Sequence, residues 1–421
     1  MNTGQHWLCA QLGAREHYAI PRALQRHHRL DGFYTDYWGK GGTRLLASKF
    51  NSKATRSLAA KHHPDIPEQK IRSRNLRSLL WTSQLKLAAG FPSTNNMYRG
   101  YCEVGRKFAC SVARQLDSHY PQNTVYFGYD TTSLEIMEKL RKENVLCVVG
   151  QVDPCRTEIE LVREEAKTWP GWQANALEVP QVFFDRHEAE WELADKVIVN
   201  SEFSRQALIS QGVISNKIAV IPLAYEPQVQ PEIQENEKTP VFTNVRPLKV
   251  LYLGQVNLRK GIQYLMKAAA TLPQGLVTID VVGPIHISEA AVKTAPDNLV
   301  FHGPVTVDKI RDWYLQADVF VLPTLSDGFA ITQLEAMAHG VPVITTPNCG
   351  DVVEDSADGY IVKPRDAEAL ATAITKYLQE PQSLAGHRAA AIRKSTQFSL
   401  DRLFERLVDA TTACRPDPPA S

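Results

Sequence analysis

The stretch from Leu322 to Thr346, LPTLSDGFAITQLEAMAHGVPVITT, decides the fold of this chain. It reads as the end of an apolar strand, a polar loop, a short helix, a Gly-Val-Pro turn and then another buried strand. Strand, helix and strand in this order predict one unit of a doubly wound parallel sheet. Two carboxylates, Asp327 and Glu335, lie eight positions apart around the start of the helix.

The loop before this helix combines groups that suit an anionic ligand with hydroxyl groups. The backbone amides of Gly328, Phe329 and Ala330 lie at the helix N-terminus, where the positive end of the helix dipole attracts a diphosphate. The carboxylates of Asp327 and Glu335 can accept hydrogen bonds from sugar hydroxyls on either side. The pattern therefore points to a nucleotide-diphosphate sugar and to glycosyl transfer, although Asp327 alone also fits a helix N-cap and Glu335 alone a solvated helix residue.

The same segment resembles the signature of the retaining glycosyltransferases called group 1 or family 4. That signature is Glu, seven residues and Glu, written around GF and LEAMA.G.PV, and this chain carries all of it except that Asp327 replaces the first Glu. The resemblance implies the α/β fold called GT-B, in which two Rossmann-like, doubly wound parallel-sheet domains face each other across a cleft. It also implies a nucleotide-sugar donor and no metal ion or other cofactor.

A second block, LYLGQVNLRKGIQYLMKAA at residues 251–269, places basic residues at a strand-to-helix turn. A strand ends at Gly254 and a helical spacing follows, so Arg259 and Lys260 lie at the turn and are positioned to hold phosphates. The alternative is a pair of solvated basic residues. In the family pattern Arg is common where Gln255 stands, and the resemblance implies that Arg259 supplies that charge instead.

Strands alternate with helices in two runs, which predicts two doubly wound domains. We expect an N-terminal acceptor-binding domain at 1–225, a proline-rich polar linker at 226–247, a C-terminal nucleotide-sugar-binding domain at 248–385, and at 386–421 a helix crossing back toward the first domain, followed by a tail. The resemblance to the family runs from about Gly13 to Leu378 and is weaker before Asp195.

The first domain departs from the family pattern at two loops. A Gly-Gly loop is replaced by the segment that begins at Gly13, where Arg15 could reach the diphosphate and His17 is either an acceptor contact or a surface residue. A His that many family members carry after a first-domain strand is absent, and Gln151 and Asp153 stand in the corresponding loop. The resemblance implies that one of these two side chains substitutes for the His.

The composition of the chain limits the classes of protein to which it can belong. The chain has 421 residues, of which 43% are hydrophobic and 22% charged, as expected for two globular domains. Its seven cysteines are odd in number, scattered and without a CxxC pair, so we expect reduced thiols rather than disulfides or a zinc site. No apolar run approaches the roughly 18 residues of a membrane span, and the N-terminus lacks a signal-peptide pattern. We expect a cytoplasmic protein, either free or peripheral at the inner face of the membrane.

The near-zero net charge hides an asymmetry. Residues 1–114 hold 19 Lys and Arg against 6 Asp and Glu, a net charge of +13, and the remainder carries −12. Within the basic part, residues 70–91 mix Arg72, Arg74, Arg77 and Lys86 with Leu76, Leu79, Leu80, Trp81 and Leu85. This mixture suits a helix on an anionic lipid surface, with Trp81 inserted. A surface helix of the first domain and a site for a phosphate-bearing acceptor remain alternatives, and nucleic acid is a weaker one.

The sequence thus predicts a retaining, hexosyltransferase-like enzyme that works without a metal ion in polysaccharide or glycolipid assembly. Its expected catalytic residues are Arg259 and Lys260 on the leaving diphosphate, Asp327 on the sugar, Glu335 on the ribose, and Asp153. Its expected donor-binding residues are Gly13, Arg15, Gly254, Gly328, Phe329 and Ala330. The alternative is a non-catalytic binding subunit with the same fold. A Rossmann dehydrogenase is disfavoured because no GxGxxG motif with a following acidic residue is present.

The basic first domain generates a prediction about membranes. Each Lys or Arg near an anionic surface contributes about 1 kcal/mol, so a few engaged residues give salt-sensitive binding. We expect the protein to sediment with anionic vesicles at low salt, and neither with neutral vesicles nor at high salt. A variant with Ser at positions 72, 74, 77 and 86 is expected to stay in the supernatant, and equal sedimentation of this variant would contradict the membrane interpretation.

Overall fold

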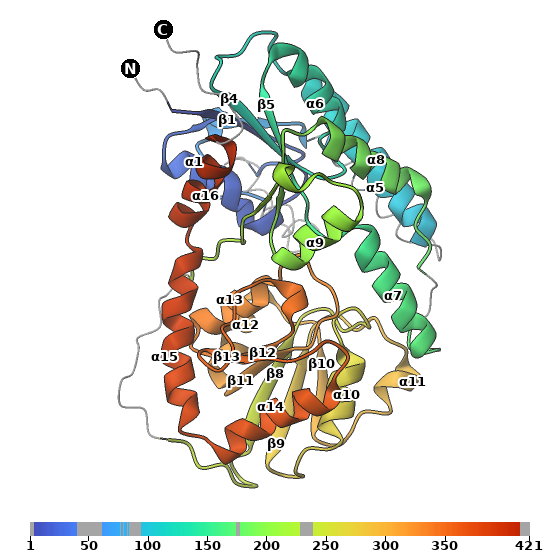
Figure 1. Ribbon diagram of the computed structural model, residues 1–421, viewed down its shortest axis with the longest axis vertical. Coiled ribbons are helices and arrows are strands. Elements are labelled where there is room, and N and C mark those ends of the chain that lie inside the picture. The colour runs from blue at the N-terminus through green and yellow to red at the C-terminus, as the bar shows by residue number, and fades with distance from the viewer. Residues whose placement is uncertain are drawn as a thin grey trace.

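The computed structural model describes residues 4–39, 61–75, 77–78, 80–81, 83, 94–173, 177–227 and 239–412. These residues form two α/β domains, one above the other in Figure 1. The strands of the first domain are β1 His6–Gln11, β2 Leu30–Thr35, β3 Ile71–Ser73, β4 Thr124–Tyr129, β5 Leu146–Gly150, β6 Lys196–Val199 and β7 Ile218–Val220. Its helices are η1 Arg15–Tyr18, α1 Ala19–Arg26, η2 Glu68–Lys70, α5 Thr94–Ala113, α6 Leu134–Leu140, η3 Arg141–Glu143, α7 Arg156–Thr168, α8 Gln181–Leu193, α9 Glu202–Ser210 and η4 Ser215–Lys217.

The second domain has the same layered construction. Its strands are β8 Leu248–Leu253, β9 Val277–Val282, β10 Leu299–Gly303, β11 Val319–Leu322, β12 Val343–Thr345 and β13 Gly359–Ile361. Its helices are α10 Ile262–Ala269, α11 Glu289–Val292, α12 Val307–Gln316, α13 Ile331–Ala338, η5 Pro347–Cys349, α14 Ala367–Gln379 and α15 Ser383–Ser395, after which the chain continues through η6 Thr396–Phe398 and α16 Leu400–Thr412.

Both sheets are parallel and doubly wound. The described strands of the first sheet lie in the order β3-β2-β1-β4-β5-β6-β7, and those of the second in the order β10-β9-β8-β11-β12-β13. Strand order therefore reverses between β1 and β4 in one sheet and between β8 and β11 in the other. In open parallel sheets, ligands bind beyond the carboxyl ends of the strands at such reversal points. The topology thus marks the loops after β1, β4, β8 and β11.

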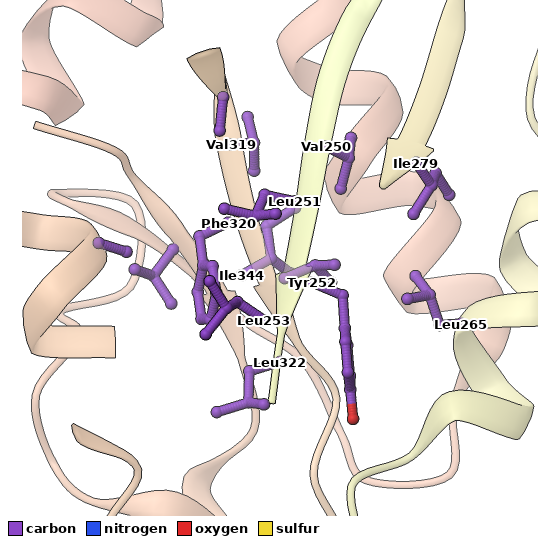
Figure 2. Close-up of a cluster of buried hydrophobic side chains, with 14 of the residues drawn as sticks. Val250, Leu251, Tyr252, Leu253, Leu265, Ile279, Val319, Phe320, Leu322 and Ile344 are labelled. Carbon is purple, nitrogen blue, oxygen red and sulfur yellow. The ribbon is translucent and has the colours of Figure 1, made fainter. Parts of the chain in front are cut away.

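The strands are apolar because helices cover both faces of each sheet. All six residues of β4 are buried, and so are all five of β5. In the second domain, Val250, Phe320 and Ile344 belong to a continuous core between the sheet and its helices (Figure 2). Tyr252 lies on β8, as Val250 does, and its hydroxyl donates to the carbonyl of Gln255 at 2.7 Å. This bond closes the loop in which the predicted basic turn begins.

The C-terminal helices join the two domains. Helix α15 runs along the side of the second domain, and α16 lies against α1 in the first domain (Figure 1). Leu403 and Leu407 are buried in the first domain's core, and the rings of His27 and Phe404 stack at 3.9 Å. Residues 413–421 lie outside the described residues.

The connection between the domains begins with ion pairs to the first domain. The Glu226 carboxylate lies 3.0 Å from Arg22 and 2.7 Å from Arg26, both on α1. Residues 228–238 of the expected linker lie outside the described residues. After them, Thr243 and Arg246 pair in a short turn that leads into β8.

Part of the expected membrane-facing segment belongs to the core. Trp81 is buried and meets the Phe108 ring edge-on at 6.3 Å, so it is not available for insertion into a bilayer. Leu80, in contrast, is 66% exposed. Leu76, Leu79, Leu85 and Lys86 lie outside the described residues. Among the residues that are described, no helix combines the length and apolar character needed to span a membrane.

A buried carboxylate organises the loop after β4. Glu190 of α8 is fully buried and accepts hydrogen bonds from the backbone N–H groups of Thr131 at 2.7 Å, Ser133 at 2.9 Å and Leu134 at 3.0 Å. The first amides of a helix have no partner within the helix. Glu190 therefore supplies acceptors at the N-terminal end of α6 and fixes the loop at a reversal point of the sheet.

Replacing Glu190 with Ala is expected to destabilise the fold by about 3 kcal/mol, because several buried amides lose their acceptor at once. Urea denaturation followed by circular dichroism measures this loss. The matched control is Glu192→Ala on the same helix, where the side chain is exposed. We expect the control to change the free energy of unfolding by no more than about 0.5 kcal/mol. Equal stability of the two variants would contradict the structural role of Glu190.

Candidate functional site

The turn between β8 and α10 holds two of the predicted cations. Gly261 precedes α10 with φ +77°, and a Cβ at this position would collide with the carbonyl of Pro323, so the close approach requires glycine. The backbone carbonyl of Arg259 accepts from the N–H of Leu325 at 2.8 Å. These contacts attach the turn after β8 to the loop after β11, which brings together the two loops marked by the topology.

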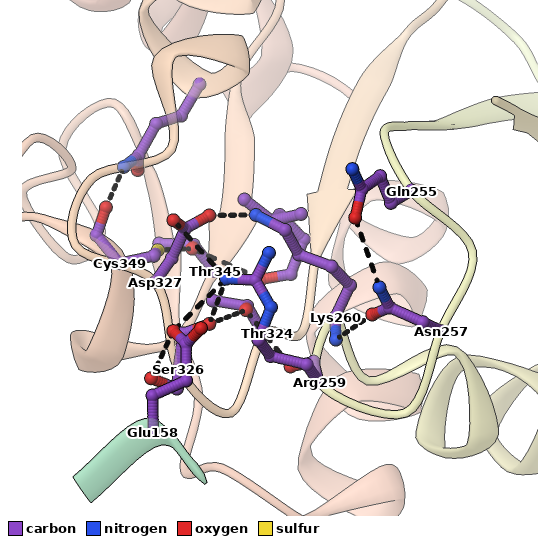
Figure 3. A network of polar contacts seen from close by, with 12 residues as sticks. Glu158, Gln255, Asn257, Arg259, Lys260, Thr324, Ser326, Asp327, Thr345 and Cys349 are labelled. Atoms are coloured by element: carbon purple, nitrogen blue, oxygen red, sulfur yellow. Dashed lines mark hydrogen bonds and ion pairs between the residues drawn. The ribbon is translucent and has the colours of Figure 1, made fainter. Parts of the chain in front are cut away.

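The side chains of this turn and loop form one charged cluster (Figure 3). The Lys260 ammonium contacts the Asp327 carboxylate directly, and an Arg259 nitrogen lies 3.7 Å from the other Asp327 oxygen. The same Arg259 nitrogen donates to the Ser326 carbonyl at 3.1 Å and lies 3.2 Å from Glu158. The structure thus brings together Arg259, Lys260 and Asp327, which the sequence analysis had proposed as one site.

The cluster is shielded from water. The Lys260 and Asp327 side chains are only 12% and 15% exposed. Burial, together with the neighbouring Arg259 guanidinium, lowers the pKa of Lys260 to about 7, and the Glu158 carboxylate opposes this shift. Two half-buried basic side chains at one turn favour anionic partners, which is the electrostatic requirement of a phosphate-binding site.

The start of α13 offers fewer free amides than the sequence suggested. The N–H of Ala330 donates to the Cys349 carbonyl at 3.0 Å, and the N–H of Asp327 donates to the Asn348 carbonyl at 2.9 Å. Gly328 and Phe329 therefore remain the candidates for donating to a ligand. A Cβ on Gly328 would collide with the Val152 carbonyl of the first domain, so the two domains touch beside this loop.

Glu335 lies in the middle of α13. Its carboxylate accepts from the hydroxyl of Tyr314, on α12, at 2.8 Å, and burial raises its pKa. The Tyr314 ring stacks on His339, with ring centroids 5.2 Å apart. The Tyr314 hydrogen bond and the electrostatic influence of His17 and His339 oppose this rise in the pKa of Glu335. Tyr314 holds one carboxylate oxygen of Glu335 and leaves the other available to a ligand.

The loop after β1 has an unusual backbone. Glu16, His17 and Tyr18 follow one another with φ of 50°, 49° and 62°, a left-handed conformation that costs non-glycine residues about 1 kcal/mol or more each. Strain of this kind persists only where the surrounding structure holds it, and it concentrates at functional sites. His17 is exposed at the centre of this strained segment.

The two residues of this loop expected to bind the donor have partners within the first domain. The N–H of Gly13 donates to Asp36 at 2.9 Å. The Arg15 guanidinium carbon lies 5.4 Å from the centre of the Tyr129 ring. Gln11 donates to the carbonyl of Arg15 at 2.9 Å. In the second domain, Gly254 directly follows β8, and its N–H donates to the carbonyl of Val282 at 3.0 Å.

The loop after β5 contains the two candidates for the missing His. Gln151 is buried and accepts from the indole nitrogen of Trp191 at 2.8 Å, so it is engaged in the core. Asp153 accepts from the N–H of Cys155 at 2.8 Å. Burial and the charge of Asp130 raise the pKa of Asp153, and Arg259 opposes this shift. Asp153 lies beside the loop after β11, because its Cα would be 3.3 Å from a Cβ on Gly328, whereas the Gln151 side chain is engaged with Trp191.

A histidine lies behind this loop. His187 of α8 is buried 3.6 Å from Asp130, which also accepts from the N–H of Val152 at 3.2 Å. Burial alone would lower the pKa of His187, but the Asp130 carboxylate outweighs it and raises the pKa to about 9. Asp130 and His187 thus form a charged pair beneath the loop that carries Asp153.

The sequence analysis missed three residues of the site. Tyr314 lies on α12, which strand β11 and the following loop separate from the helix of Glu335, and no motif connects the two residues. Ser326 directly precedes Asp327, yet a single serine in a loop has no distinctive pattern. Glu158 belongs to the first domain and reaches the cluster only because α7 lies against the second domain (Figure 3). Within the described residues, no three His, Cys, Asp or Glu side chains are grouped so that they could hold a metal ion.

Comparison with known proteins finds a family match over the second domain. Residues 247–380 match the model of the family described as Glycosyl transferases group 1. The second domain is therefore similar to the glycosyltransferase domains of this family. The chain is 27% identical over 185 residues to a D-inositol 3-phosphate glycosyltransferase of Streptomyces griseus. The aligned region covers 40% of this chain and 39% of that protein. Arg259, Lys260, Asp327 and Glu335 all fall inside the matched family segment.

Two further relatives come from surface polymer and lipid synthesis, by their names. An alpha-galactosylglucosyldiacylglycerol synthase of Streptococcus pneumoniae is 25% identical over 226 residues, 51% of this chain and 59% of the relative. An amylovoran biosynthesis glycosyltransferase of Erwinia amylovora is 26% identical over 226 residues, 50% of this chain and 54% of the relative. The chain thus spans between 39% and 59% of the length of these three curated relatives.

Solved structures confirm the fold over almost the whole chain. HepE of Anabaena in complex with UDP superposes with a TM-score of 0.60 at 13% identity, covering 97% of this chain and 100% of HepE. Sucrose-phosphate synthase from Thermosynechococcus elongatus gives a TM-score of 0.60 at 17% identity, covering 97% and 99%. The predicted GT-B fold, with two Rossmann-like parallel-sheet domains, is confirmed.

Proposed function

We propose that this protein is a retaining glycosyltransferase that moves a hexose from a nucleotide-diphosphate sugar to a hydroxyl acceptor. The observation that carries the proposal is the shielded cluster of Arg259, Lys260 and Asp327 at the reversal point of a domain similar to those of the group 1 glycosyltransferases. An arrangement of two half-buried basic side chains beside a helix N-terminus suits a diphosphate. The same cluster lies against the other domain, which we expect to hold the acceptor.

Each candidate site residue of the second domain has a role in this proposal. Arg259 and Lys260, with the amides of Gly328 and Phe329, stabilise the negative charge that develops on the leaving diphosphate. The Asp327 carboxylate accepts hydrogen bonds from hydroxyls of the donor sugar. Glu335, oriented by Tyr314, accepts from the ribose hydroxyls.

The chemistry requires no nucleophilic carboxylate. The acceptor hydroxyl attacks the anomeric carbon from the face that the diphosphate leaves, and its proton passes to a departing phosphate oxygen. The product therefore keeps the configuration of the donor. The protein positions the two substrates and polarises the leaving group. Asp153, the carboxylate on the first-domain side, accepts a hydrogen bond from the donor sugar in place of the family His.

The acceptor is a hydroxyl on a growing polysaccharide or glycolipid, which we propose to be linked to a lipid. The names of the relatives from Streptococcus pneumoniae and Erwinia amylovora support this class. The basic first domain, with a net charge of +13 over residues 1–114, supports a peripheral position on an anionic membrane, at its cytoplasmic face. A soluble acceptor with phosphate groups would use the same charges.

A binding subunit without catalysis is the second candidate. It is favoured by Gln151, which stands in the loop where the family carries its His but is engaged with Trp191. Hydrolysis of the donor by the purified chain separates the two candidates, because a glycosyltransferase slowly transfers sugar to water and a binding subunit does not.

Replacing Lys260 or Glu335 with Ala is expected to lower turnover by about 100-fold while the fold is retained, because each change removes a group positioned on the donor. The measurement is the initial rate with the donor identified from a panel of nucleotide sugars. Lys293→Ala, an exposed lysine of the same domain, is the matched control and should keep the wild-type rate. Near wild-type rates in both site variants would contradict the assignment.

Activity is expected to persist in excess EDTA, since Arg259 and Lys260 supply the positive charge that a metal ion supplies in other transferases. The assay compares the initial rate of the EDTA-treated protein with that of the protein given Mg²⁺ or Mn²⁺. Loss of activity on chelation and its recovery with either ion would show that the diphosphate is held differently.

A further inference from the structure

Glu158 reaches from the first domain into the cation cluster of the second (Figure 3). It lies in the first turn of α7, and one of its carboxylate oxygens is 3.2 Å from Arg259 and accepts from the Ser326 hydroxyl at 3.0 Å. Ser326 is fully buried, and the Glu158 side chain is only 17% exposed. The contact is thus a shielded, charge-assisted interaction and not a solvated ion pair at the surface.

The partners of Glu158 are those that a phosphate would use. A guanidinium and a hydroxyl that converge on one oxygen bind a carboxylate or a phosphate with the same geometry. The Glu158 and Asp327 carboxylates lie against Arg259 and Lys260, so two acidic side chains are paired with two basic ones in the cluster. A diphosphate that entered this cluster beside an ionised Glu158 would meet its negative charge at short range.

A second set of contacts keeps Glu158 close to the cluster. Further along α7, Glu165 is fully enclosed and accepts from Gln263 at 2.9 Å, from Tyr264 at 3.0 Å and from Arg365 at 2.6 Å, all in the second domain. Helix α7 is therefore docked on the second domain independently of Glu158. Because the helix is held, the local concentration of the Glu158 carboxylate at Arg259 is high.

We propose that Glu158 is an internal competitor of the donor: its carboxylate occupies the phosphate position on Arg259 and Ser326, and must leave when a nucleoside diphosphate binds. This proposal rests on the proposed function of the cluster. In this role Glu158 sets the affinity of the site for the donor. It acts on the diphosphate and not on the transferred sugar or the acceptor. Donor binding then frees the first turn of α7 while the Glu165 contacts keep the helix docked.

The test is isothermal titration of the full chain with UDP and with GDP. Glu158→Gln keeps the size of the side chain and removes its charge, and we expect it to lower the Kd of the nucleotide that binds by about tenfold, within the usual range of coupling between sites. Glu160→Gln, an exposed change on the same helix, is the matched control and should leave the Kd unchanged. Glu158→Ala serves as a second variant and should also bind more tightly.

A double-mutant comparison separates this proposal from the function on which it rests. Arg259→Ala should weaken nucleotide binding, and in that background Glu158→Gln should bring no gain, because the contested cation is gone. If Arg259→Ala weakens binding but Glu158→Gln and Glu158→Ala bind like wild type or more weakly, the competitor role is overturned and the donor site stands. If no variant binds UDP or GDP, both proposals are overturned.

Discussion

The structure depends on keeping two cations, Arg259 and Lys260, side by side at a shielded turn. Such a pair is stable only with anions in contact, and without a ligand Asp327 and Glu158 provide them. Gly261 allows the turn to approach the loop after β11, and the docking of α7 brings Glu158 to Arg259. Both features hold the two basic residues next to their carboxylate partners. The two basic side chains are therefore already paired with carboxylates before any donor binds. A donor must take the place of a carboxylate of the protein.

The fold brings loops of both domains together at this cluster. The reversal points of the two sheets carry the loops after β1, β4, β8 and β11, and beside the cluster Gly328 approaches Val152 while Arg259 pairs with Glu158 of the first domain. The left-handed backbone of Glu16 to Tyr18 follows β1, at one of these reversal points. A site shared by two domains in this way can bring a donor held by one domain to an acceptor held by the other.

Much of this could be predicted from the sequence, because local patterns carry it. The alternation of strands and helices predicted both parallel sheets, and the two motifs predicted that Arg259, Lys260 and Asp327 converge. Contacts between distant segments were not predictable: Tyr314 orients Glu335 through the packing of α12 on α13, and Glu158 reaches Arg259 through the docking of α7. The burial of Trp81 was likewise hidden, because an apolar residue among basic ones fits a membrane surface and a core equally well.

The most direct test of the central claim is a crystal structure of the protein with UDP. The account requires the diphosphate in contact with Arg259 and Lys260, the ribose hydroxyls on Glu335, and the Glu158 carboxylate displaced from Arg259. A diphosphate bound elsewhere on the chain, or one bound at this edge of the sheet without contact to either cation, would contradict it.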